Sequence, residues 1–206
     1  MRYKITRYGL TNISEEAKNK LEGLIYEIVE QLLSIDDDEI VSEQEAYVGR
    51  TKSISKPLTN ILEERMVHKE WNKEVRIFQS NFKSYQTNRW SLDFEKDGIS
   101  LEIAFNHEEG TAWNIIKGYI SNKSTKIPKT ITTIGSIIIT ATNDLKRIGG
   151  FDGSIGSFEK YQEYMGVFEE LLEYPIILIG LEGPDTFMVK HKNVVNKKLA
   201  KIERRR

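Results

Sequence analysis

Hydrophobic residues follow two patterns along the chain. Some recur with the period of an amphipathic helix, and others form short apolar runs typical of strands. Ser14, followed by two glutamates, has the pattern of a helix N-terminus. Apolar residues then recur on one stripe from Ala17 to Leu33, the spacing of an amphipathic helix. The same spacing predicts a second helix that opens at Ser55-Lys56-Pro57, with proline in its first turn, and further helices over residues 113–120 and 157–173.

Shorter apolar stretches between these helices predict strands over residues 75–78, 90–94, 99–105, 134–142 and 175–181. The last two read IGSIIITAT and PIILIGL, which are apolar without alternation, as expected of central strands buried on both faces. Strands mixed with helices in this way predict an α/β fold, with a central mixed β-sheet flanked by helices. We expect a single domain over residues 1–206.

Length and composition fit a globular protein and exclude several other classes. The 206 residues are 39% hydrophobic and 30% charged, which argues against disorder. The absence of cysteine excludes a disulfide framework, Cys-ligated zinc and an iron–sulfur cluster. No stretch approaches the ~20 apolar residues of a membrane span, and the first residues lack the apolar core of a signal peptide. We therefore expect a cytoplasmic protein without a membrane partner.

The net charge of −1 conceals an asymmetry between the two ends of the chain. Eleven carboxylates and two lysines lie between Ser14 and Ala46, whereas residues 190–206 contain eight lysines and arginines and one glutamate. This basic C-terminal tail is typical either of a segment that binds nucleic acid or of a solvated tail. The successive aspartates at 36–38 lack the alternating spacing and central glycine of a calcium loop, so we expect a solvated loop there.

The most informative stretch covers residues 90–105, where two alternating segments flank Asp97-Gly98. This dipeptide is a strong signal for the two-residue turn of a β-hairpin. Such a turn fixes the register of the two strands and places Asp93 directly opposite Glu102 on one face. The other face collects apolar side chains for the core, namely Leu92, Phe94, Leu101, Ile103 and Phe105.

The two facing carboxylates, Asp93 and Glu102, need compensation because like charges opposite one another destabilise a sheet. A raised pKa, a basic neighbour or a bound cation would each reduce the repulsion. Mg²⁺ is a suitable cation, since it prefers oxygen ligands and keeps several waters. A hairpin twisted enough to splay both side chains into solvent is the alternative, and the residues alone leave both open.

Several sequence blocks, in order, resemble the BglII-type restriction endonucleases, a group within the PD-(D/E)xK nucleases. They are a helix ending in LLSI, the stretch VGRTKSISKPLTNILEERMVHKEW, the hairpin LDFEKDGISLEIAF, and then IGSIIITAT, SIGSFEKYQEY and YPIILIGL. The resemblance covers most of the chain. It implies a restriction-endonuclease-like fold and Mg²⁺-dependent, site-specific hydrolysis of double-stranded DNA at a short palindrome, leaving 5′-phosphate ends.

By this resemblance, Asp93 and Glu102 are acidic active-site residues. The metal ion is implied to lie between Asp93, the backbone carbonyl of Ile103 and the scissile phosphate. Glu74 matches a further active-site position upstream of the hairpin. The chain departs from the family at Ala104, where the pattern has Lys, Gln or Glu, because alanine can neither orient nor activate the attacking water.

Another side chain has to supply what Ala104 lacks if the chain is an active nuclease. Lys117 is the first candidate, because its predicted helix follows directly from the strand that carries Glu102. A solvated lysine on an amphipathic helix is the alternative interpretation. His107 and Glu108, just after the same strand, are further candidates, although a histidine in that place is more often structural.

Base-reading residues are expected where the buried strand 134–142 ends. Asn143, Lys146 and Arg147, together with Ser154 in the glycine-rich segment 149–156, are residue types that bind base edges in the major groove. A polar surface loop is the alternative for this segment, which lacks the Gly-Lys-Ser/Thr of a nucleotide P-loop. Specific cleavage of a palindrome implies a homodimer with one active site for each strand.

Two competing functions come from other classes of protein. Ala104 makes a DNA-binding protein that has lost catalysis on the same fold reasonable, and it would bind duplex DNA without Mg²⁺-dependent nicking. A glycoside hydrolase could also use a carboxylate pair. Against that second function, the nearby Phe94 and Phe105 fall on the apolar face of the hairpin instead of forming a sugar platform beside the acids.

Overall fold

A mixed six-stranded sheet forms the centre of the computed structural model, which describes residues 1–79, 83–194 and 197–205. The strand order is β1-β6-β5-β4-β3-β2, in which β4, β5 and β6 are parallel to one another and the other pairings are antiparallel. The strands are β1 (Tyr3–Tyr8), β2 (Asn72–Arg76), β3 (Ser91–Lys96), β4 (Ile99–Ile103), β5 (Gly135–Ala141) and β6 (Ile176–Leu181).

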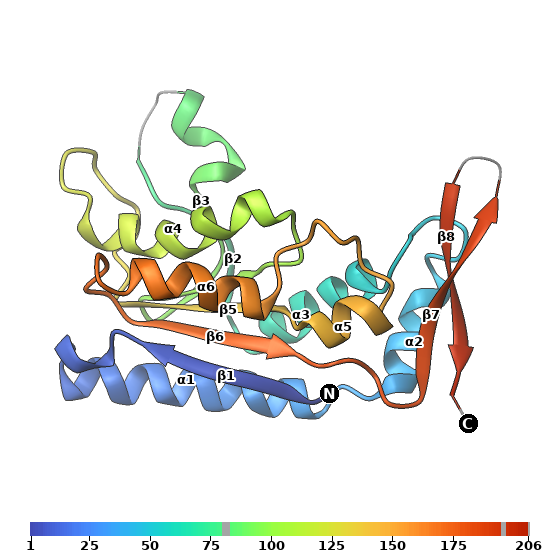
Figure 1. The fold of residues 1–206 in the computed structure, drawn as a ribbon. Coiled ribbons are helices and arrows are strands. Elements are labelled where there is room, and N and C mark those ends of the chain that lie inside the picture. The colour runs from blue at the N-terminus through green and yellow to red at the C-terminus, as the bar shows by residue number, and fades with distance from the viewer. Residues whose placement is uncertain (80–82, 195–196, 206) are drawn as a thin grey trace.

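Helices cover both faces of this sheet (Figure 1). They are α1 (Glu15–Leu33), α2 (Asp37–Glu45), α3 (Ser55–His68), α4 (Thr111–Lys123), α5 (Asn143–Ile148) and α6 (Phe158–Phe168). Alternate residues of β5 serve two separate cores, since Ile137 and Ile139 pack with α1 and α3, and Ile138 packs with α4 and α6. Both faces of β5 are therefore buried, and the predicted α/β fold with a central mixed sheet is confirmed.

Most predicted elements are present, with some shifts at their ends. Ser14 caps α1 by accepting a hydrogen bond from the backbone N–H of Ala17 at 3.2 Å. The last helix is shorter than its apolar stripe suggests, because α6 ends at Phe168 and not at Glu173. Within the described ranges, every helix is too short or too polar to cross a membrane.

The hairpin of β3 and β4 has the predicted register. Phe94 pairs with Leu101, and the turn is formed by Asp97 and Gly98. Both turn residues have positive φ, 53° and 80°, the conformation that a two-residue hairpin turn needs and that glycine adopts without steric cost. Phe94 and Leu101 are fully buried, so the apolar face of the hairpin belongs to the core as predicted.

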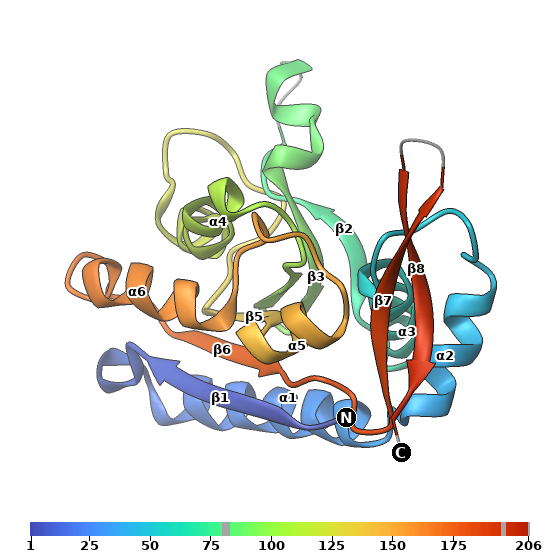
Figure 2. The same cartoon turned by 45° about the vertical axis from the view of Figure 1, so that its right-hand side comes forward.

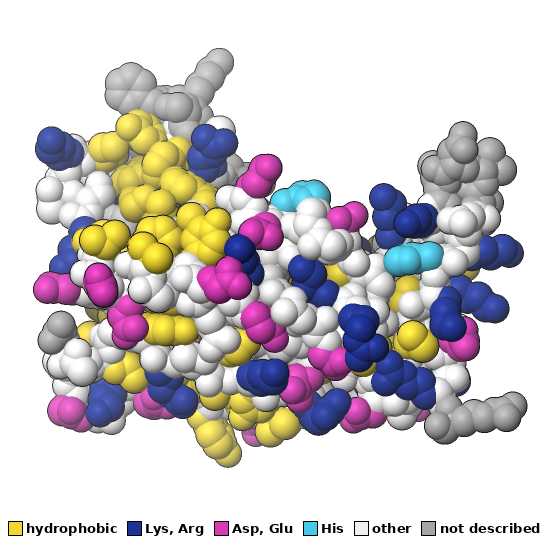
Figure 3. Space-filling view, in the orientation of Figure 1, with side chains coloured by type: hydrophobic (Ala, Val, Ile, Leu, Met, Phe, Trp, Pro, Cys, Tyr) yellow, Lys and Arg dark blue, Asp and Glu magenta, His cyan; other side chains and the backbone are white. Residues whose placement is uncertain are grey.

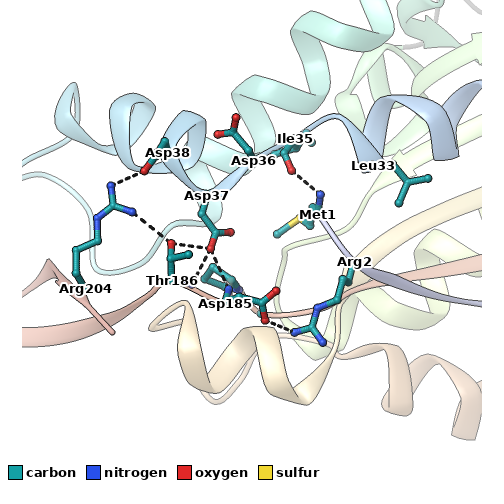
Figure 4. Close-up of a pocket in the computed structure, with 12 residues that line it drawn as sticks. Met1, Arg2, Leu33, Ile35, Asp36, Asp37, Asp38, Asp185, Thr186 and Arg204 are labelled. Carbon is teal, nitrogen blue, oxygen red and sulfur yellow. Dashed lines mark hydrogen bonds and ion pairs between the residues drawn. The ribbon is translucent and has the colours of Figure 1, made fainter. Parts of the chain in front are cut away.

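The prediction of a solvated loop at Asp36–Asp38 is wrong. Asp36 caps α2, and the two acids after it hold the C-terminal part of the chain. Asp37 Oδ2 accepts hydrogen bonds from both the backbone N–H and the hydroxyl of Thr186, each at 2.8 Å, and Asp38 pairs with Arg204 at 2.5 Å (Figure 4). The run of acids binds polar groups 149 and 166 residues away, which sequence spacing does not reveal.

The basic segment expected as a C-terminal tail belongs to a hairpin over its described residues. β7 (Phe187–Val194) and β8 (Lys197–Arg204) form a separate two-stranded antiparallel sheet that stands beside α2 and α3 (Figure 2). Phe187 and Val189 pack into the core at its base, and the backbone N–H of Ala200 donates to the carbonyl of Thr51 at 2.9 Å. The hairpin is thus anchored to the rest of the molecule at its base. Its exposed lysines lie on a part of the chain that projects from the surface.

Candidate active site

Three carboxylates occupy neighbouring positions across β2, β3 and β4. The β2–β3 pairs on either side of Glu74 place it opposite Asp93, and continuation of the β3–β4 register places Asp93 opposite Glu102. Glu74 is exposed and has a φ of 56°, so this position interrupts the regular ladder at the edge of the sheet. The register therefore brings together all three predicted acids, with Glu74 at the rim and Glu102 at the buried end.

Asp93 and Glu102 are held side by side by hydrogen bonds to each other's strand. Asp93 Oδ2 accepts a hydrogen bond from the backbone N–H of Ile103 at 3.0 Å. Glu102 Oε1 accepts one from the backbone N–H of Asp93 at 3.4 Å. Glu102 is only 2% exposed and Asp93 is half-buried, so the acids converge and the alternative in which they splay into solvent does not apply.

Lys117 from α4 supplies the positive charge in this cluster. Its ammonium group forms an ion pair with Glu102 Oε2 and donates a hydrogen bond to the carbonyl of Ser91 at 3.1 Å. The lysine is 5% exposed, so the pair is removed from water. It lies here because α4 packs closely on the sheet at Gly118, where a Cβ would lie 1.9 Å from Ser136 Oγ.

Burial and mutual repulsion shift both acids in the same direction. Desolvation is the main cause that raises the pKa of Glu102 to about 8, and repulsion by Asp93 adds to it. Desolvation also raises the pKa of Asp93. The charge of Lys117 opposes both shifts, because it favours the ionised carboxylates. The sequence therefore indicated correctly that the pair needs compensation, and both a raised pKa and a basic neighbour are present.

The donor atoms fit a hard divalent cation that takes some ligands from elsewhere. Asp93, Glu102 and the carbonyl of Ile103 offer only oxygen, the ligand type that Mg²⁺ prefers. In the described part of the chain, no three acidic or histidine side chains form a group that could hold a metal by themselves. An ion bound at the two acids would therefore depend on water and on substrate oxygen, which is typical of Mg²⁺ at phosphate-cleaving sites.

Ala104, which stands where the family pattern has Lys, Gln or Glu, lies in the core. Ala104 is 1% exposed and packs in the same apolar cluster as Ile115 and Tyr161, so its side chain has no polar role. His107 and Glu108 have partners of their own, because His107 Nδ1 lies 2.8 Å from Ser154 Oγ and Glu108 pairs with Lys160 at 3.3 Å. Of the three candidates to replace the motif residue, Lys117 is the one that contacts Glu102.

The residues predicted to read DNA bases differ in how they are placed. Asn143 and Arg147 are exposed on α5, which follows the carboxyl end of β5, and Arg147 pairs with Asp144 at 2.7 Å. Lys146 instead donates to the carbonyl of Gly153 at 3.2 Å. The hydroxyl of Ser154 donates within its own loop, to a carboxylate two residues earlier. Lys146 and Ser154 therefore shape the loop, and of the four only Lys146 is half-buried, the other three being exposed.

Sequence reasoning missed a basic groove between the body and the C-terminal hairpin. The groove has a volume of about 770 Å³ and is lined by two cations that precede α3 and by residues of β7, β8 and the glycine-rich loop: Arg50, Lys52, Phe151, Asp152, Gly153, His191, Lys198 and Leu199. Basic character in the C-terminal segment was visible in the sequence. The partnership of that segment with Arg50 and Lys52 was not, because about 140 residues separate them.

Comparison with known proteins gives one family and two similar structures. The family model described as restriction endonuclease BglII/BglIII matches residues 5–181. A crystal structure of restriction endonuclease BglII complexed with a DNA 16-mer is similar over 100% of both chains, with a TM-score of 0.64 and 18% identity. A crystal structure of free BglII is similar over 99% of this chain and 93% of its own, with a TM-score of 0.52 and 16% identity. No curated protein sequence matches the chain.

Proposed function

The chain belongs to the restriction endonuclease BglII/BglIII family, and from that premise we propose a Mg²⁺-dependent enzyme that cleaves double-stranded DNA at a short palindrome. Family membership makes it a type II site-specific deoxyribonuclease. The finer proposal, with 5′-phosphate and 3′-hydroxyl products, is carried by the cluster of half-buried Asp93 with buried Glu102 and Lys117. Two acids can hold a metal ion for phosphodiester hydrolysis, and a lysine beside them can stabilise the charge that develops.

In this proposal Asp93, Glu102 and the carbonyl of Ile103 hold the ion. When bound, Mg²⁺ lowers the pKa of a coordinated water and stabilises charge on the phosphate. Glu74 lies opposite Asp93 on β2 and adds an exposed negative charge beside it. Lys117 favours the ionised form of Glu102, against the burial that raises its pKa, and would place a fixed positive charge beside the attacking water, the task for which Ala104 is unsuited.

Duplex DNA is proposed to lie across the hollow between two raised parts of the molecule. The segment before β3 forms one of these raised parts, and the β7–β8 hairpin forms the other. Lysines and arginines gather on the hairpin (Figure 3). On the hairpin, Lys190, Lys192, Lys198 and Lys201 are exposed. Exposed cations on this hairpin suit the sequence-independent phosphate contacts that dominate DNA affinity. Base reading is proposed for Asn143 and Arg147 on α5.

Replacing Lys190, Lys192 and Lys198 together by alanine is expected to weaken DNA binding about equally for all sequences. Each phosphate that is no longer neutralised lowers the slope of log affinity against log salt by about 0.9. Fluorescence anisotropy over a series of salt concentrations, in EDTA, measures this slope. The matched control replaces Lys4, Lys18 and Lys20, exposed residues of β1 and α1, and should leave the slope unchanged. Equal slopes for the two triple variants would remove the hairpin from the DNA interface.

A homodimer is proposed because cleavage of both strands of a palindrome requires two active sites related by two-fold symmetry. Apolar side chains on the outer side of α4 and α6 suit a second copy. Trp113 and Ile116 are half-buried on α4, and Val167 and Leu171, in and just after α6, are each 66% exposed. Sedimentation equilibrium with Val167→Glu tests this face, since a buried charge there is expected to give monomers.

Digestion of an unmethylated plasmid with Mg²⁺, in parallel with EDTA, tests the proposed function. Discrete Mg²⁺-dependent bands are expected, and sequencing their ends gives the recognition site, the cut position and the end chemistry. Absence of cleavage together with retained duplex binding would favour the other candidate, a DNA-binding protein in which Ala104 marks a disabled site. Random fragments in place of discrete bands would contradict site specificity.

A further inference from the structure

The glycine-rich loop is joined to the segment that follows β4. The backbone N–H of Gly156 donates to the carbonyl of Asn106 at 3.1 Å, and the N–H of Glu108 donates to the carbonyl of Ser154 at 2.8 Å. The joined segment begins at Asn106, only a few residues after Glu102 and Ile103, which lie on β4. Any shift of the loop is therefore transmitted to the end of the strand that presents the site.

Three side chains, which we call the latch, reinforce this junction: Asp152, Ser154 and His107. Asp152 Oδ1 accepts a hydrogen bond from the hydroxyl of Ser154 at 2.8 Å and another from its backbone N–H at 3.0 Å. These bonds lower the pKa of Asp152, so this carboxylate is an acceptor only. His107 Nδ1 lies 2.8 Å from the same hydroxyl oxygen.

The hydrogen-bond directions in the latch follow from this chemistry. Because the hydroxyl proton of Ser154 is directed to Asp152, its oxygen must accept from His107, and His107 therefore carries a proton on Nδ1. The order is His107 to Ser154 to Asp152. The one proton of the Ser154 hydroxyl is committed to Asp152, so within the latch this side chain cannot donate to a base, the role predicted for it from the sequence.

We propose that the latch is a positioning device, which ties the loop between α5 and α6 to the strand that carries Glu102 and Ile103. The inference rests on the proposed function and names His107 and Ser154 as positioning residues for cleavage. DNA that is bound correctly by α5 and the loop then has its scissile phosphate aligned with Asp93 and Glu102. Binding itself does not require the latch, because none of its three residues is among the lysines proposed to contact phosphate.

Alignment of the reacting groups affects turnover more than affinity. A displacement of about 1 Å costs up to about 100-fold in rate when the groups must be in near-attack geometry, although the contacts that give affinity persist. Loss of the latch is therefore expected to lower kcat and to leave the dissociation constant for DNA nearly unchanged. A purely structural role predicts instead a lower melting temperature without this split.

Two substitutions of His107 separate positioning from direct contact with DNA. The amide nitrogen of His107→Asn lies where Nδ1 lies and can donate to Ser154, whereas the longer side chain of His107→Gln reaches the place of Nε2 and loses the latch. We expect His107→Gln to lower kcat about tenfold on a duplex with the recognition site, with DNA affinity in EDTA unchanged within about twofold. His107→Asn is expected to retain most of the activity.

If both substitutions of His107 impair turnover, a double-mutant cycle of His107→Gln with Ser154→Ala decides whether the two residues act together. If the latch is one device, Ser154→Ala adds no further loss to His107→Gln, whereas additive losses overturn the inference. Activity retained by His107→Gln and lost by His107→Asn also overturns it, because the ring then acts through Nε2. Glu109→Ala, an exposed neighbour, controls for disturbance of the segment.

The outcomes also separate this inference from the proposed function. A wild-type protein that fails to cleave with Mg²⁺ contradicts the proposed function. A wild-type protein that cleaves, with His107→Gln equal to it in kcat, contradicts the latch alone.

Discussion

Replacing Glu102 by glutamine is expected to lower DNA cleavage by roughly 1,000-fold or more, and to leave DNA affinity in EDTA within about twofold of wild type. Glutamine has the same shape and keeps one acceptor oxygen, but it lacks the negative charge that holds a divalent cation. Because Glu102 is 2% exposed, it is not positioned to contribute to the phosphate contacts of the surface. Single-turnover cleavage and anisotropy in EDTA measure the two quantities separately.

Asp93→Asn is the matched variant, because it also removes a proposed metal ligand but leaves the Glu102–Lys117 ion pair intact. Both variants should lose cleavage, and they should differ in stability. Glu102→Gln leaves the buried ammonium group of Lys117 without its counter-charge, which costs about 3 kcal/mol. Asp93→Asn removes repulsion from Glu102 and should leave the free energy of unfolding unchanged or raised. Intact cleavage in either variant would contradict the assignment of the site.

Replacing Lys117 by methionine is expected to lower cleavage about 100-fold or more near neutral pH, since a preorganised positive charge beside the reacting groups is lost. Methionine fills a similar volume without the charge. Lys117 lowers the pKa of Glu102, so its removal moves that pKa further above about 8. Because the proposed site needs ionised Glu102, the remaining activity should rise as the pH rises, and the pH profile should shift to higher pH.

Lys117→Arg is the control that keeps the charge, and it should retain the pH profile even where its bulk lowers the rate. Cleavage rates between pH 6 and pH 9 give both the size of the effect and the direction of the shift. Near-normal turnover by Lys117→Met would remove this lysine from the mechanism. A rate loss without a shift of the pH profile would indicate that it acts on the attacking water alone and not through Glu102.

Local patterns account for the elements that were predicted well. The stripe of α1, the apolar runs of β5 and β6 and the Asp97-Gly98 turn each depend on residues close together in the chain. The strand β1 and the hairpin of β7 and β8 were missed. Their alternating polar and apolar residues make a weak signal until a partner strand is available, since β1 pairs with β6 across more than 160 residues.

Features that depend on distant partners were the ones misjudged. The aspartates at 36–38 have the local pattern of a solvated loop, because their partners, Thr186 and Arg204, lie at the other end of the chain. Likewise, α6 ends earlier than its apolar stripe suggests. Periodicity records which residues are apolar, but it does not record where packing against the rest of the molecule ceases to stabilise the helix.

At the active site, the sequence by itself determined the facing acids. A two-residue turn fixes the register of a hairpin, and the strict alternation of side chains then decides which residues share a face, so Asp93 and Glu102 had to meet. The tertiary structure decided how buried those acids are and that Lys117 is their cation. It also decided that Ser154 bonds within a latch. These properties arise where segments far apart in the chain pack together, as α4 does on the sheet at Gly118, and local spacing carries no information on such contacts.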